Sequence, residues 1–120
     1  MTRIRTLIVL GAVGAALAVT ASAGAALPKL TGTVGPGFTI SLKRFNKPLV
    51  SLKAGTYSIT VSDKSNIHNF RLRGPGGVNK EITAVGFVGT KTVTVKLVKG
   101  IYRYVCDPHA TTMKGSFKVT

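Results

Sequence analysis

Acidic residues, cysteine and helical periodicity are scarce or missing in this sequence of 120 residues. The single cysteine, Cys106, cannot form an intramolecular disulfide, so a folded domain must rest on its core alone. Three acidic residues stand against 17 lysines and arginines, and the net charge of +14 favours acidic partner proteins, anionic envelope polymers or a negatively charged membrane surface. The lysines are scattered rather than clustered with stacking aromatic residues, which argues against a nucleic-acid partner. For most individual lysines, keeping the surface soluble is the simpler role.

The first 23 residues have the pattern of a secretory signal peptide. Arg3 and Arg5 form a short basic region, residues 7–19 are apolar, and Ala21-Ser22-Ala23 supplies the small residues of a cleavage site. A retained membrane anchor is the alternative, but the apolar run is short and lacks a basic stop-transfer flank. We predict cleavage between residues 23 and 26 and export of a single domain, residues 27–120, to the periplasm, the cell envelope or the extracellular space.

Short strands separated by turns fill the rest of the sequence. Alternation of apolar and polar residues, the mark of a half-buried strand, is clearest at 38–42, 57–61 and 92–97. Further strands are expected at 30–34 as an edge strand, and at 49–52, 81–85, 101–106 and 115–120. No segment after residue 26 has sustained helical periodicity, and the sequence contains no internal repeat. The pattern predicts an all-β, antiparallel Greek-key sandwich, which would bring remote strands together at one end.

Metal-ligating side chains are concentrated near the C-terminus. His109 follows Cys106 by three positions, and Met113 follows His109 by four. The other histidine, His68, is followed by Phe70 and Leu72 at successive spacings of two, so a strand there would direct all three side chains toward the same apolar face. Two histidines, one cysteine and a weak methionine form the ligand set of a blue-copper electron-transfer centre.

Each of these residues also has a plainer explanation. A lone cysteine is commonly a small core residue, a buried histidine can be hydrogen-bonded in the core, and a methionine can simply pack. Together, however, the only cysteine, both histidines and the only methionine besides the initiator form one coherent set. Zinc would lack a fourth strong ligand. A Cys/His pair without a supporting Asn or Asp is weak evidence for a catalytic nucleophile, and we expect no enzymatic activity.

The sequence around these ligands resembles a known family. Residues 100–109 and 113–115 resemble the C-terminal ligand loop of plastocyanin/azurin-like cupredoxins, particularly plastocyanins, pseudoazurins and amicyanins, and His68-Asn69-Phe70 resembles their upstream ligand motif. The resemblance implies one type 1 copper ion. Its ligands would be the ring nitrogens of His68 and His109, the thiolate of Cys106 and, at a longer distance, the sulfur of Met113.

The same resemblance implies roles for residues around the ligands. Asn69 would join the two ligand loops and help to hydrogen-bond the thiolate, and Tyr102 would be a corner tyrosine. The rim around His109, with Pro108 and Ala110, would exchange electrons with partners. Three residues separate His109 from Met113, more than in the amicyanin-like loop and fewer than in the plastocyanin-like one.

We therefore expect an exported, monomeric one-electron carrier that cycles between Cu(I) and Cu(II), with a redox partner that has an acidic docking surface. Copper storage, delivery or resistance is the alternative function, although the chain lacks the additional Met or His clusters that would favour it. A metal-free adhesive or structural sandwich is a third possibility, motivated by the basic surface.

Overall fold

The computed structural model describes residues 11–16 and 25–120. The expected signal peptide, residues 1–23, lies largely outside the described residues. Within the described ranges, no helix has the length and apolar character needed to cross a membrane.

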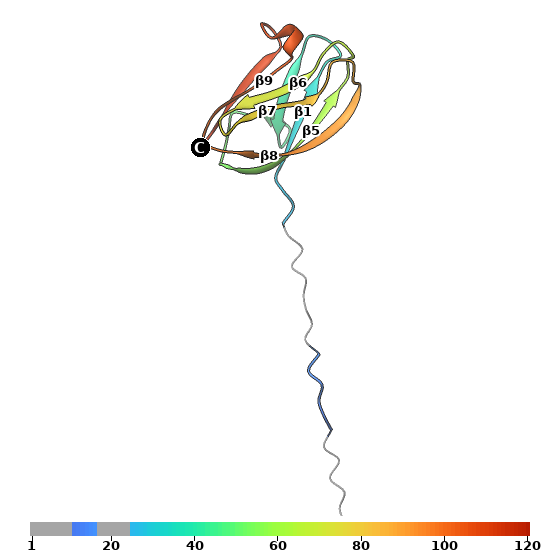
Figure 1. Cartoon of the computed structure of the whole chain (residues 1–120), viewed down its shortest axis with the longest axis vertical. Helices are drawn as coiled ribbons and strands as arrows, with labels where there is room; N and C mark the ends of the chain where they lie inside the picture. Colours follow the sequence, from blue (N-terminus) through green and yellow to red (C-terminus); the bar gives the residue numbers. More distant parts are fainter. Residues whose placement is uncertain (1–10, 17–24) are drawn as a thin grey trace, which may run out of the picture.

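The described strands form a sandwich of two five-stranded sheets. Figure 1 shows the strands packed together in this sandwich. The first sheet has the order β3-β2-β1-β5-β8 and the second the order β4-β10-β9-β6-β7. The strands are β1 (Lys29–Val34), β2 (Ile40–Arg44), β3 (Lys47–Pro48), β4 (Ser51–Leu52), β5 (Gly55–Asp63), β6 (Phe70–Gly74), β7 (Val78–Thr83), β8 (Gly89–Leu97), β9 (Gly100–Val105) and β10 (Lys114–Val119). The predicted all-β sandwich is confirmed.

Two features of the pairing differ from the prediction. β1 pairs with β5, and β4 with β10, in parallel, so both sheets are mixed rather than purely antiparallel. β1 is also a central strand, because β2 and β5 pair with its two edges. Its alternation is obscured in the sequence because Gly32 stands between the buried residues Leu30 and Val34. A Cβ atom on Gly32 would lie only 3.0 Å from the ring of Phe70, so a side chain here would require the neighbouring core side chains to shift by a few tenths of an ångström.

The core follows the alternation of the strands. In β5, every second residue from Tyr57 onward is buried, and in β6 Phe70 and Leu72 are fully buried. Tyr102 in β9 is also buried, and its hydroxyl accepts a hydrogen bond from the Val98 amide and donates one to the Pro75 carbonyl. This tyrosine therefore ties two turns to the core, as the resemblance implies.

The pairing of β6 with β9 sets the position of the ligands. These strands are antiparallel neighbours, with Arg71 opposite Val105, so the start of β6 lies beside the end of β9. His68 is two residues before β6, and Cys106 directly follows β9. Two loops that are remote in sequence consequently meet at one end of the sandwich.

Candidate metal centre

The loop between β9 and β10 is held in shape by its own backbone. A short 3-10 helix, η1 (Asp107–His109), begins directly after Cys106, and Pro108 lies in its first turn, where a missing N–H costs nothing. The amide of His109 donates to the Cys106 carbonyl at 3.0 Å, and the amide of Met113 donates to the His109 carbonyl at 2.8 Å. The Cys106 amide donates to the Met113 carbonyl at 3.0 Å, which closes the loop.

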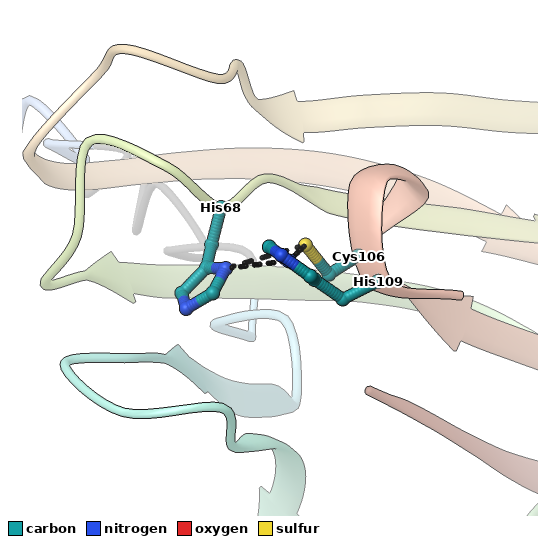
Figure 2. A group of neighbouring side chains, drawn as sticks. All are labelled: His68, Cys106 and His109. Atoms are coloured by element: carbon teal, nitrogen blue, oxygen red, sulfur yellow. Dashed lines mark hydrogen bonds between the residues drawn. The ribbon is translucent and has the colours of Figure 1, made fainter. Parts of the chain in front are cut away.

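His68, Cys106 and His109 converge between the two loops, as Figure 2 shows. The two Nδ1 atoms are 3.0 Å apart, and each lies 3.6 Å from the Cys106 sulfur. A point equidistant from these three atoms is about 2.0 Å from each, close to the bonds of about 2.0 to 2.3 Å that imidazole nitrogen and thiolate make to zinc-sized ions. The three donors are thus spaced to enclose one transition-metal ion.

The composition and burial of this group suit a soft metal. His68, Cys106 and Met113 are fully buried, whereas His109 is partly exposed. Among the described residues, it is the one group of three or more His, Cys, Asp or Glu side chains close enough to share an ion, and it contains no carboxylate. Thiolate and imidazole donors favour copper or zinc over magnesium, calcium or manganese.

The other expected site residues lie around this group. Met113 ends the loop immediately before β10, and Pro108 and Ala110 are exposed on either side of His109. Asn69 links the two ligand loops: its Oδ1 accepts a hydrogen bond from the Asp107 amide at 2.7 Å, and its Nδ2 donates to the Asp107 carboxylate at 2.8 Å. The resemblance also implied that Asn69 helps to hydrogen-bond the thiolate. Within the described part of the chain, however, the Cys106 sulfur has hydrogen-bonding contacts only with the Nδ1 atoms of His68 and His109.

An ionic network, absent from the sequence-based prediction, supports this link. Arg71 donates from Nε to Asp107 at 2.7 Å, from one terminal nitrogen to Glu81 at 3.0 Å and from the other to Asn79 at 3.1 Å. Asn69 also donates to Glu81 at 3.0 Å. Two of the three acidic residues in the chain, Glu81 and Asp107, therefore form hydrogen bonds beside the ligand loop. The scarcity of acidic residues was the only feature of the sequence that could have pointed to this network.

The network also controls the ionisation of Asp107. Its partial burial would raise the pKa of the carboxyl group, but the hydrogen bonds from Arg71 and Asn69 outweigh this effect, and the pKa is lowered. The hydrogen bond with Asp107 in turn raises the pKa of Arg71. Asp107 is consequently an anion that Arg71 and Asn69 hold beside Cys106.

Phe38 is a second residue that contacts the candidate ligands and that the sequence analysis did not identify. It was expected inside a strand, but β2 begins at Ile40 and Phe38 lies in the preceding loop. Its ring makes edge-on contacts with both imidazoles, at centroid distances of 5.4 Å to His68 and 4.9 Å to His109. The Phe38 side chain is 63% exposed, so it covers the histidines on their solvent side.

Comparisons with known proteins agree with this geometry. The model of the copper-binding plastocyanin/azurin family matches residues 37–120. Amicyanin-alpha of Methylorubrum extorquens is 31% identical over 81 residues, which cover 67% of each chain. The solved structure of rusticyanin from Thiobacillus ferrooxidans has a TM-score of 0.56 and 25% identity, covering 77% of this chain and 76% of its own. A Cu(I) amicyanin variant, with a TM-score of 0.50, 16% identity and coverage of 78% and 83%, shares the fold.

Proposed function

Because this chain belongs to the plastocyanin/azurin family of copper-binding proteins, we propose that it is an exported, monomeric one-electron carrier that exchanges electrons with partner proteins and catalyses no reaction itself. Membership of the family supports copper as the metal and electron transfer as the general role. The observation that carries the specific proposal is the convergence of His68, Cys106 and His109 at distances that suit one metal ion.

In this proposal, His68 and His109 would hold copper through Nδ1, together with the thiolate of Cys106 and, more weakly, the thioether of Met113. When bound, copper supplies a couple between Cu(I) and Cu(II) that gains or loses one electron. Cys106 must lose its proton to bind, and both histidines must be neutral. The absence of a carboxylate ligand keeps the donor set soft.

The residues around the ligands keep them in place. His68, Cys106 and Met113 are fully buried, and the backbone hydrogen bonds of the loop fix the positions of Cys106 and His109. Asn69 and Asp107 tie this loop to the loop of His68. Ligands that are held in this way need little rearrangement when the charge on the metal changes, which favours rapid electron exchange.

Electrons would enter and leave through the partly exposed edge of His109. Pro108 and Ala110 flank this edge and are exposed, so a partner can approach the imidazole closely. Phe38 adds a large apolar surface beside the same ring. Since the chain is strongly basic, we propose that the partner is an acidic protein, and that the association weakens as the salt concentration rises.

The test is spectroscopic. The purified protein, loaded with Cu(II), should have an intense visible absorption band from charge transfer between the thiolate and copper, together with the EPR spectrum of one type 1 site. Cys106→Ala should abolish the band, and Met113→Leu should retain it with a shifted potential. A wild-type protein that is colourless under oxidising conditions, or that binds copper equally well without Cys106, would refute the proposal.

A further inference from the structure

The outer face of the second sheet carries a groove of about 580 Å³. Three cationic side chains line it, Arg73, Arg103 and Lys114, and its apolar lining includes Ile101, Val105 and Ala110. An adjoining hollow of about 310 Å³ shares Arg103 and Lys114 and continues along β10 over Ser116. We call the larger hollow the basic groove.

The positive charge of the basic groove is only partly balanced by the acidic residues of the protein. Arg73 and Arg103 stand directly opposite each other on β6 and β9, an arrangement of like charges that costs stability. Arg73 contacts the Asp107 carboxylate at 3.4 Å, but Arg71 and Asn69 already hold that carboxylate at shorter distances. Among the described residues, Arg103 and Lys114 form no ion pair.

The basic groove lies beside the proposed electron-exchange rim. Val105 directly precedes Cys106, and Ala110 directly follows His109, so the groove wall is part of the chain that carries the ligands. Ile101 is 56% exposed and extends the apolar surface away from the site. A chain bound in the groove would therefore lie next to the metal centre and contact apolar and cationic side chains together.

We propose that the basic groove is the docking site for an acidic segment of the redox partner, one that carries carboxylates and at least one apolar side chain. This inference rests on the proposed function, because it identifies the surface that the partner uses. Arginine presents a planar fork of donors that matches a carboxylate, and the facing pair of Arg73 and Arg103 supplies two such forks. The apolar lining favours a protein segment over a purely ionic polymer, which would leave Ile101 and Val105 without apolar contacts.

The experiment uses the mature protein, without the expected signal peptide, loaded with diamagnetic Cu(I). Its backbone amide resonances are followed by NMR. The probes are a short synthetic peptide of glutamate and leucine, inorganic phosphate, and vesicles of anionic phospholipid. The test variant is the double substitution Arg103→Glu/Lys114→Glu. The control is Lys29→Glu/Lys96→Glu, which makes the same change of charge at exposed positions of β1 and β8 in the other sheet.

The peptide should shift the amides of residues 101–105, 110 and 114, and the test variant should bind it at least about tenfold more weakly, because two attractive charges become repulsive. The control should lose less than about threefold. Equal losses in both variants, shifts spread over all lysines, or stronger perturbation of the groove by phosphate or vesicles than by the peptide would overturn the proposal. The copper spectrum of the test variant should match that of the wild type, so loss of docking is distinguishable from loss of the metal site.

Discussion

Replacement of Arg71 by methionine should destabilise the ligand loop without removing any ligand. Arg71 contacts Asp107, Glu81 and Asn79 together, and only 21% of its side chain is exposed. The bond to Asp107 is charge-assisted and partly buried, and such bonds contribute about 1.5 to 3 kcal/mol, whereas the more exposed contact with Glu81 contributes about 0 to 1 kcal/mol. Allowing for solvent, we expect Arg71→Met to lose about 2 kcal/mol, which lowers Tm by roughly 10 °C in a domain of this size.

The effect of Arg71→Met should depend on pH. The pKa of Asp107 is lowered in the folded protein, so the stabilisation from its charge is fully present above the unfolded pKa of about 3.9 and is lost as the pH falls through the folded value. In Arg71→Met the pKa of Asp107 should rise toward its ordinary value. The difference in stability between the two proteins should therefore be constant above about pH 5 and should shrink in more acidic solution.

The assay is urea unfolding of the copper-free, reduced protein, because bound metal would add its own binding energy. Arg103→Met is the matched control: it removes the same side chain from the neighbouring strand, where no ion pair is present among the described residues, and should change stability by less than about 0.5 kcal/mol. A loss at Arg71 no larger than the loss at Arg103 would refute the argument, as would a difference that stays constant into acid.

Three further predictions follow from the core and the site. Cys106→Ser should lose the intense visible band and yet unfold cooperatively, as circular dichroism can check; loss of the fold would assign Cys106 a structural role. Phe38→Ala should shift the copper potential and increase the motion of the His109 ring in NMR relaxation, because it removes the contact between the two rings. Its Tm should stay nearly constant, because Phe38 is 63% exposed. If ring motion and potential were both unchanged, the contact with Phe38 would have no influence on the metal site. Gly32→Ala should lose about 1 to 3 kcal/mol in thermal unfolding, since its Cβ would lie 3.0 Å from core side chains. Gly37→Ala, with nothing within 4 Å, should be nearly neutral, and equal effects at the two glycines would contradict the packing argument.

Most of the secondary structure was predictable because alternation along a strand is a local property. The alternation at 57–61 and 92–97 matches β5 and β8, and the spacing of His68, Phe70 and Leu72 matches three fully buried side chains. The candidate ligands were also predictable, because the chain contains one cysteine and two histidines and leaves little choice of donors. These predictions required only the types of residues and their spacing.

The tertiary structure alone decided which remote segments meet. The central position of β1 and its parallel pairing with β5 depend on backbone hydrogen bonds that leave no mark in the alternation. The contacts of Arg71 with Asp107 and of Phe38 with the imidazoles join residues at least 30 positions apart. The sequence thus determined the chemical identity of the site, whereas its geometry and supporting contacts arose from the packing of two sheets, since strand pairing is a choice among many partners of similar local pattern.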